Sequence, residues 1–190
     1  MRVGIVGVQG AVSEHEEMVR ALGHKPVWIT RPGALDDISA LIMPGGESTT
    51  ISRLLESTGL FAKIREKGAG GMPIFGTCAG MVLLAKKGGA QVRKTQQKLL
   101  GLMDMEVSRN AFGRQRESFE ASLDIEGVGN RFPCIFIRAP AVMGTWGGCR
   151  PLARFGKAIV AAEQGNLLAT SFHPELSGDM RIHEYFLAKA

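Results

Sequence analysis

The chain has 190 residues, of which 45% are hydrophobic and 22% charged, and its formal net charge is +5. These fractions exclude a disordered chain, a collagen repeat and a coiled coil, and the length fits one domain, so we expect a single domain over residues 1–190. Aromatic residues make up 6% of the chain and few stand among the basic residues. Aromatic residues interleaved with basic ones provide the platforms on which nucleic-acid bases stack. Since few aromatic residues stand there, the sequence predicts no nucleic-acid partner.

The cysteine count bears on the compartment and on metal binding. Cys78, Cys134 and Cys149 form an odd set without a close pair. This excludes a disulfide framework and a four-cysteine zinc site, so we expect no metal and a cytoplasmic location. No signal peptide is expected at the N-terminus, because it lacks a small-residue cleavage site. Residues 68–85 are uncharged over nearly the length of a membrane span, but five glycines and Pro73 interrupt them. We therefore expect no membrane segment.

Strands and helices alternate in the first half of the chain. Residues 3–8 form an apolar run typical of a buried strand, and the helix that follows ends at Gly23. One face of that helix carries Ala11, His15, Met18, Val19 and Leu22. Further strands are predicted at residues 26–29, 40–43 and 73–75, and further helices around residues 51–55 and 79–85. This alternation predicts an α/β fold with a mostly parallel sheet and helices on both faces.

The second half of the chain has a different pattern. Its strand-like runs follow one another with glycine-containing turns between them, at residues 102–107, 118–125, 134–137, 158–162 and 167–172. A final helix is predicted over residues 181–189. Successive strands joined by turns favour antiparallel pairing, so we expect a smaller antiparallel annex beside the parallel sheet.

The strongest chemical motif is GTCAG at residues 76–80, which follows a predicted strand and opens a helix. It has the pattern of a nucleophile elbow with cysteine in place of serine. Side chains at Gly76 and Gly80 would collide with neighbouring backbone in so sharp a turn. The helix N-terminus behind the turn favours a thiolate. An isolated cysteine is more often a small core residue, but this context favours Cys78 as a nucleophile.

A nucleophile needs a base, and the base needs a group that orients it. His15, His24 and His183 have structural interpretations on or beside predicted helices. His173 instead ends a strand and is followed by a proline and Glu175. We expect His173 to take the thiol proton and Glu175 to hold the ring in the correct tautomer. A zinc deaminase site is excluded because no cysteine follows Glu175.

Two glycine-rich segments could bind an anion. Residues 44–48 (PGGES) follow a strand, and their bare backbone N–H groups suit an oxyanion hole. The alternative is an ordinary helix entry capped by Ser48. Residues 71–78 have the glycine spacing of a phosphate loop, but Thr77 and Cys78 stand where that loop needs Lys and Ser or Thr. No nucleotide cofactor is therefore expected.

Together these motifs resemble the class I, triad-type glutamine amidotransferases, and within them the glutaminase-subunit family of the two-component pyridoxal 5′-phosphate synthases. The resemblance covers nearly the whole chain and implies a flavodoxin-like fold. The segments that carry it are residues 9–11 (QGA), 14–15 (EH), 44–50 (PGGESTT), 76–80 (GTCAG), 108–115 (SRNAFGRQ), 136–140 (FIRAP) and 171–175 (SFHPE).

The resemblance implies hydrolysis of L-glutamine to L-glutamate and ammonia without a cofactor. Cys78 would form a thioester, and His173 would protonate the departing ammonia and then activate water. The backbone N–H groups of Gly46 and Ala79 would form the oxyanion hole. The residues implied in glutamine binding are Gly46, Glu47, Ser48, Arg109, Ile137 and Arg138.

The resemblance also implies a protein partner. This is the synthase subunit that builds pyridoxal 5′-phosphate, the active form of vitamin B6, from pentose and triose phosphates. It would receive the ammonia directly and would complete the oxyanion hole when it binds. The alternatives are a glutaminase subunit of another biosynthetic amidotransferase, an elbow-cysteine hydrolase or peptidase, and a non-catalytic binding domain. Residues 146–150 receive no role.

Overall fold

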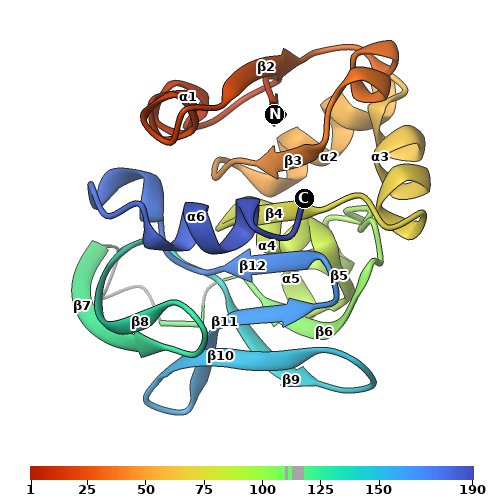
Figure 1. The fold of residues 1–190 in the computed structure, drawn as a ribbon. Coiled ribbons are helices and arrows are strands. Elements are labelled where there is room, and N and C mark those ends of the chain that lie inside the picture. Colours follow the sequence, from red (N-terminus) through yellow and green to blue (C-terminus); the bar gives the residue numbers. More distant parts are fainter. Residues whose placement is uncertain (110, 113–117) are drawn as a thin grey trace.

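The computed structural model describes residues 1–109, 111–112 and 118–190, so the motif at residues 108–115 lies partly outside the described residues. Figure 1 shows the path of the chain. The first elements are β1 (Arg2–Val6), α1 (Val12–Ala21), β2 (Lys25–Ile29), the 3-10 helix η1 (Pro32–Asp37), β3 (Ala40–Met43), α2 (Ser48–Ser57), α3 (Leu60–Ala69), β4 (Ile74–Thr77), α4 (Ala79–Leu84), β5 (Ala85–Gly88) and α5 (Ala90–Lys94). The later elements are β6 (Met103–Ser108), β7 (Ser118–Ile125), β8 (Gly129–Ile137), β9 (Ala141–Thr145), β10 (Arg150–Phe155), β11 (Ala158–Gln164), β12 (Leu167–Thr170), the 3-10 helix η2 (Pro174–Leu176) and α6 (Arg181–Leu187).

Ten of the described strands form one sheet in the order β2-β1-β3-β4-β12-β11-β9-β6-β5, with β10 paired to β11. The five strands β2, β1, β3, β4 and β12, which are consecutive in this order, run parallel to one another. Every residue of β3, β4 and β12 is buried, as expected for parallel strands covered on both faces. The strands β7 and β8 form a separate two-stranded antiparallel sheet.

Two hydrophobic cores lie on opposite faces of the main sheet. Leu41 and Met43 of β3 pack into the core that contains residues of α2, α3 and α4. Ala40 and Ile42, which alternate with them along the strand, pack into the core that contains residues of α1, α6 and β8. Figure 1 shows α6 crossing one face of the sheet with α4 behind it. The predicted mostly parallel sheet with helices on both faces is thus confirmed.

The antiparallel part is also present, but it is arranged differently from the simple annex that the sequence suggests. Only β7 and β8 leave the main sheet, whereas β6, β9, β10 and β11 extend it by antiparallel pairing. The strand β12 returns to the parallel half, beside β4. The elements α3, β5, α5, β9 and β10 were not predicted; α3, for example, buries only Leu60 and Ile64, so its apolar signal is weak. None of the described helices is long and apolar enough to cross a membrane.

The strand order places the loops that carry the motifs at one edge of the sheet. The parallel strands β2-β1-β3-β4-β12 follow the order of a flavodoxin-like sheet, in which ligands bind outside the carboxyl ends of the strands. Met43 pairs with Gly76, and Thr77 pairs with Thr170. Because these strands end side by side, the segments that follow β3, β4 and β12 meet at that edge.

Candidate functional site

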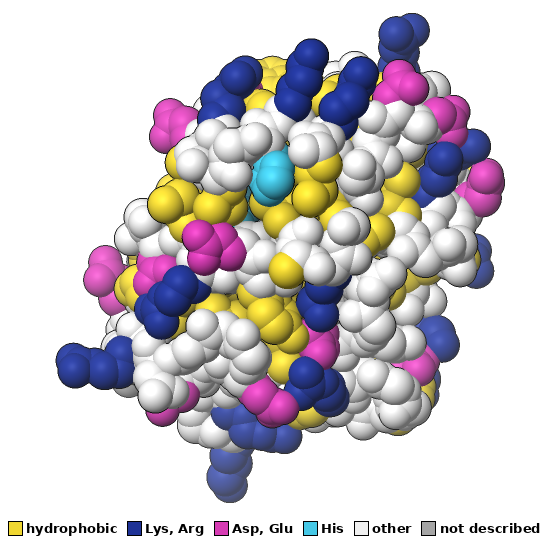
Figure 2. Space-filling model, in the orientation of Figure 1, with side chains coloured by type: hydrophobic (Ala, Val, Ile, Leu, Met, Phe, Trp, Pro, Cys, Tyr) yellow, Lys and Arg dark blue, Asp and Glu magenta, His cyan; other side chains and the backbone are white. Residues whose placement is uncertain are grey.

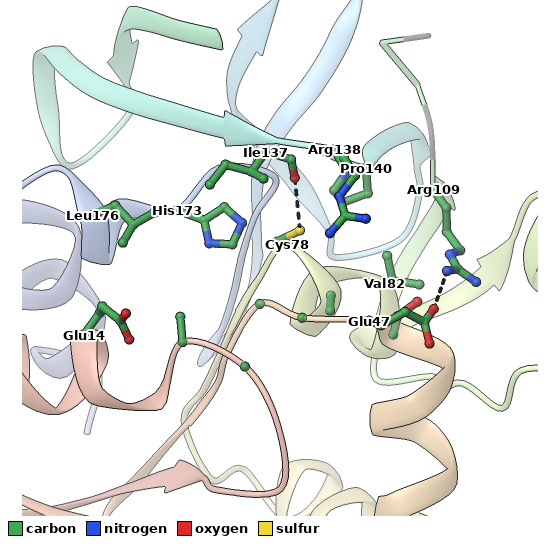
Figure 3. A pocket seen from close by; sticks show the side chains of 16 residues that line it. Glu14, Glu47, Cys78, Val82, Arg109, Ile137, Arg138, Pro140, His173 and Leu176 are labelled. Carbon is green, nitrogen blue, oxygen red and sulfur yellow. Dashed lines mark hydrogen bonds and ion pairs between the residues drawn. The ribbon is translucent and has the colours of Figure 1, made fainter. Parts of the chain in front are cut away.

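A cavity of about 350 Å³ lies at this edge and opens to solvent (Figure 3). Its volume is within the range of small-molecule sites. It brings together most of the residues that the sequence singled out, and also several that it did not, among them Val82 and Leu176. The predicted residues that line it are Gly46, Glu47, Ser48, Cys78, Ala79, Arg109, Ile137, Arg138 and His173.

Cys78 is the single residue between the end of β4 at Thr77 and the start of α4 at Ala79. Its backbone has φ 49° and ψ −100°, a conformation that an L-residue rarely adopts and that costs about 1–3 kcal/mol. A Cβ atom on Gly76 would lie 2.5 Å from the carbonyl carbon of Gly80, and one on Gly80 would collide with the carbonyl oxygen of Met43. Both glycines of the elbow are therefore required by the close approach of backbone, as the sequence predicts.

The thiol of Cys78 faces the cavity, and its Sγ lies 3.9 Å from the carbonyl oxygen of Ile137, to which it can donate. The elbow is held to β12 by a 2.7 Å hydrogen bond from the Cys78 N–H to the Thr170 carbonyl. Ala79 is the first residue of α4, so its N–H has no acceptor within the helix. That N–H group remains available to a ligand beside the thiol.

His173 and Glu175 lie next to Cys78 on the segment that follows β12. The Nδ1 atom of His173 is 2.7 Å from Oε1 of Glu175. Burial by itself would lower the pKa of His173, but hydrogen bonds with Cys78 and Glu175 raise it to about 10. The ring therefore holds a proton at neutral pH, which suits a group that stabilises a thiolate and later protonates a leaving amine.

Two neighbours explain how the His173 ring is held. Glu175 is buried behind the ring and does not line the cavity. Burial opposes ionisation of Glu175, yet the charges and hydrogen bonds of its histidine neighbours hold its pKa below the ordinary value. On the other side, a Cβ atom on Gly45 would collide with Cε1 of the His173 ring. A glycine at this position thus leaves the space that the ring occupies.

The loop between β3 and α2 differs in one detail from the sequence interpretation. Ser48 does not cap α2; the cap is Glu47, whose carboxylate accepts hydrogen bonds from the backbone N–H groups of Thr49 (3.1 Å) and Thr50 (2.7 Å). Ser48 is the first helical residue and donates to Oε1 of Gln97 at 3.1 Å. Burial opposes ionisation of Glu47, but these hydrogen bonds and the charge of Arg109 lower its pKa to about 2. Glu47 is therefore a charged helix cap at the mouth of the cavity.

The two predicted arginines have different environments. Arg109 donates from Nη2 to Glu47 at 2.6 Å and from Nη1 to the Thr49 hydroxyl at 2.8 Å. Arg138 has an unusual backbone φ of 44°, and its guanidinium points into the cavity near Cys78 (Figure 3). Arg138 has no ion-pair partner among the described residues. Arg109 is thus already neutralised by Glu47, whereas Arg138 is free to meet an anionic group.

Sequence reasoning missed a buried histidine pair beside Glu175. His15 and His183 were each given a separate place on a predicted helix, but the structure brings them into contact, 3.0 Å apart between Nδ1 and Nε2. His15 also contacts Thr77 and Glu175. The two histidines are 168 residues apart in the chain, so no local spacing could have linked them.

Two observations concern metal ions and the distribution of charge among the described residues. Within the described part of the chain, no group of three His, Cys, Asp or Glu residues is arranged to hold a metal ion. Figure 2 shows one face of the molecule, where Lys and Arg side chains stand mainly around the outline with Asp and Glu among them. They do not gather there into one basic patch.

Comparison with known proteins connects this geometry to a family. Residues 5–190 match the SNO glutamine amidotransferase family. A protein of Pelotomaculum thermopropionicum named pyridoxal 5′-phosphate synthase subunit PdxT is 53% identical over 190 residues, which cover 100% of this chain and 95% of that protein. A relative of the same name from Methanopyrus kandleri is 50% identical over 201 residues, and the match covers 100% of this chain and 100% of that protein.

Solved structures agree with these relatives. A crystal structure described as a glutamine amidotransferase has a TM-score of 0.92 and 43% identity, with 98% of this chain and 97% of that chain covered. The structure of PurLQS from Thermotoga maritima has a TM-score of 0.69 at 16% identity and covers 98% of this chain and 97% of that chain, a likeness of fold alone. The chain therefore belongs to the SNO glutamine amidotransferase family.

Proposed function

We propose that this chain is the glutaminase subunit of pyridoxal 5′-phosphate synthase, and that residues 1–190 act as one glutaminase domain. The family and its relatives, which bear the name of that synthase over their full length, support the proposal. The observation that carries it is the juxtaposition of an elbow cysteine, a protonated histidine and a buried glutamate at the carboxyl edge of the sheet. This arrangement can transfer an acyl group to sulfur.

The proposed reaction has two halves. In the first, the Sγ of Cys78 attacks the side-chain amide carbon of glutamine, and the C–N bond breaks as His173 gives its proton to the leaving nitrogen. The products are ammonia and a thioester on Cys78. In the second, His173 takes a proton from water as that water attacks the thioester, and glutamate leaves while the thiol is restored. Glu175 stays ionised and holds the His173 ring through both halves.

Negative charge develops on the amide oxygen in both halves, and we assign it to backbone donors. Ala79 supplies the N–H at the start of α4, next to the attacking sulfur. Gly46 lines the same cavity and has a φ of 153°, which a residue with a side chain rarely adopts. Donors of this kind stabilise a tetrahedral intermediate by about 2.7–4 kcal/mol each.

The α-carboxylate and α-ammonium groups of glutamine need partners of opposite charge. Arg138 is the expected carboxylate ligand, because it points into the cavity and Arg109 is already paired with Glu47. A guanidinium can bind a carboxylate through two parallel hydrogen bonds. Glu47, Ser48 and Ile137 would complete the glutamine site around the cavity mouth.

The partner in this proposal is the synthase subunit, which uses the ammonia to build pyridoxal 5′-phosphate from pentose and triose phosphates. Transfer within a complex keeps ammonia away from water, where protonation would make it unreactive. A partner that completes the site when it binds would also prevent waste of glutamine. The proposal includes a cytoplasmic location, which the three free cysteines of the chain support.

Glutamine turnover, measured with and without the synthase subunit, tests the proposal. We expect turnover to rise strongly when the synthase is added, and C78A to abolish it. The C78A complex should still make pyridoxal 5′-phosphate from an ammonium salt, which shows that the complex is intact. The buried Cys134 offers the matched control, and C134A should retain turnover. Near-normal turnover by C78A would overturn the triad, and turnover unchanged by the synthase would overturn control by the partner.

A further inference from the structure

A buried histidine lies directly behind the triad glutamate. His15 on α1 has no solvent exposure. Its Nε2 atom is 3.5 Å from Oε2 of Glu175 and 3.2 Å from the hydroxyl oxygen of Thr77, the residue that precedes the nucleophile. Oε2 is the glutamate oxygen that does not face His173; it is buried, and none of its contacts with the described residues, the 3.5 Å approach of His15 included, has the geometry of a hydrogen bond. The His15 ring therefore lies against the oxygen of Glu175 that His173 leaves free.

The other side of the ring determines where its proton lies. His15 Nδ1 is 3.0 Å from Nε2 of His183, and Nδ1 of His183 is buried without a partner among the described residues. If His183 carries its proton on Nε2, it donates to His15, and its unpartnered Nδ1 is only an unused acceptor. If the proton were on Nδ1 of His183, a buried N–H would be left without an acceptor, which is the costlier arrangement. The first arrangement places the His15 proton on Nε2, facing Glu175.

The charges around the pair agree with this assignment. Burial lowers the pKa of His15 and is opposed by the nearby Glu175; His173 lowers it further, and Glu14 raises it. Burial, with His15 beside it, lowers the pKa of His183 to about 3. Burial therefore disfavours the charged form of both rings, and a neutral ring carries one N–H. A lone pair of His15 aimed at the carboxylate would be repelled by it, so the carboxylate itself selects the Nε2 proton.

We propose that His15 is a positioning residue of the triad: its Nε2–H, hydrogen-bonded to Thr77 and close to Oε2 of Glu175, attracts the carboxylate electrostatically and holds it so that Oε1 meets His173. This rests on the proposed function, since it assigns Glu175 to the triad. His15 touches neither glutamine nor the reacting atoms. It acts through Glu175 on the His173 ring, and through that ring on the Cys78 thiolate. His183 contributes by donating a hydrogen bond to Nδ1 of His15, which leaves the His15 proton on Nε2.

The test is the pH dependence of Cys78 alkylation by iodoacetamide, followed by mass spectrometry of the Cys78 peptide. In H15L the carboxylate is no longer held with Oε1 facing His173, so it stabilises the His173 imidazolium less, and alkylation of Cys78 should begin at higher pH. We expect the midpoint to rise by about one pH unit, which is a tenfold slower alkylation on the acid side. H15Q, whose side-chain amide can place an N–H near the position of Nε2, should restore most of the wild-type profile.

The matched control is F186L, which removes from α6 a ring that packs on Phe75 in the same buried layer and leaves His15, His183 and Glu175 in place. Its alkylation profile should superimpose on that of the wild type. An H15L profile equal to that of the wild type, or an H15Q profile as displaced as that of H15L, would overturn the proposal. In the complex with the synthase, H15L should lower kcat for glutamine about tenfold and leave KM unchanged, because His15 does not contact glutamine.

A measurement on the wild-type chain decides the matter even if H15L does not fold. Nitrogen-15 spectra of the histidine side chains, with His15 assigned from H15Q, report which nitrogen carries the proton. We expect the neutral His15 ring to carry its proton on Nε2 at pH 7.5, and a proton on Nδ1 would overturn the inference. Neither this nor the alkylation requires glutamine. A chain that shows both patterns but hydrolyses no glutamine with the synthase would overturn the proposed function and leave the positioning role of His15 intact.

Discussion

Gly45 offers a direct test of how closely turnover depends on the position of the His173 ring. A Cβ atom at Gly45 would collide with Cε1 of the ring and would lie 3.1 Å from Nδ1 and 3.3 Å from Nε2. Ordinary contact between carbon atoms is about 3.5–4 Å, so in G45A the ring must move by roughly 1 Å. The backbone of Gly45 is not in the left-handed region, so the substitution adds crowding at the ring without backbone strain at Gly45.

The expected loss follows from the geometry of acyl transfer. A misplacement of about 1 Å costs on the order of 10²-fold in rate, or about 2.7 kcal/mol in the barrier. We therefore expect G45A to reduce kcat/KM for glutamine about 100-fold in the complex with the synthase. Synthesis from an ammonium salt should stay normal, because the synthase site is untouched.

A matched control separates crowding at the ring from a general effect of adding a methyl group. Gly144 on β9 has no atom within 4 Å of a built Cβ and is not in the left-handed region. G144A should therefore keep wild-type turnover. If G45A and G144A turned over glutamine within twofold of each other, the reasoning that the ring position limits the rate would be refuted.

Four further outcomes are expected. E175Q should lower kcat by up to about 10⁴-fold, because it leaves the thiol and imidazole but favours the wrong tautomer; a variant with full turnover would remove Glu175 from the mechanism. R138M should raise KM for glutamine with little effect on kcat, and an unchanged KM would exclude Arg138 as the carboxylate ligand. Loss of the helix cap in E47A should lower the free energy of unfolding by about 1 kcal/mol at pH 7. Because the pKa of Glu47 is lowered to about 2, its stabilisation is present above its ordinary pKa of 4.5 and fades as the pH falls towards 2; acid unfolding curves of wild type and E47A should therefore converge, and parallel curves would contradict the assignment. Finally, iodoacetamide at pH 8 should label Cys78 and spare Cys134, whose pKa burial raises to about 12, and equal labelling would contradict the burial argument.

Much of the candidate site could be predicted from the sequence because its parts are local. The elbow at residues 76–80 combines a strand, a glycine, the cysteine, a second glycine and a helix in consecutive positions. Its steric requirements act between residues only a few positions apart, so the motif carries its own geometry. The same holds for His173 and Glu175, which are two residues apart and meet at 2.7 Å.

The alternation of strands and helices likewise predicted the parallel half of the sheet, because buried strands such as β3 and β4 begin with short apolar runs. The place of β12 was beyond such reasoning. It pairs on one side with β11, which precedes it in the chain, and on the other with β4, some 90 residues earlier. The pairing of β12 with β4 brings His173 to Cys78. Which strands become neighbours is determined by long-range packing in the folded chain, and no local pattern in the sequence shows it.

The N-terminal cap of α2 could not be assigned correctly from the sequence for a related reason. Both Glu47 and Ser48 stand at the predicted helix entry, and serine is the commoner cap. The structure gives the position to Glu47, whose longer side chain reaches Thr49 and Thr50 and also meets Arg109, which lies 62 residues further along the chain. Ser48 is instead drawn to Gln97. Long-range partners, not the local propensity, selected the cap.

The histidines show the same division. Sequence spacing placed His15 on an apolar helix face and could say no more, since its partners Thr77, Glu175 and His183 come from three other elements of the fold. Steric fit and hydrogen-bonding capacity depend on neighbouring residues, so the sequence by itself was enough to predict Cys78, His173 and Glu175 as nucleophile, base and orienting carboxylate, and the structure places these three side chains together. The environment that sets their protonation arises only when the sheet and its two helical layers exclude water around them, and that was decided by the tertiary structure.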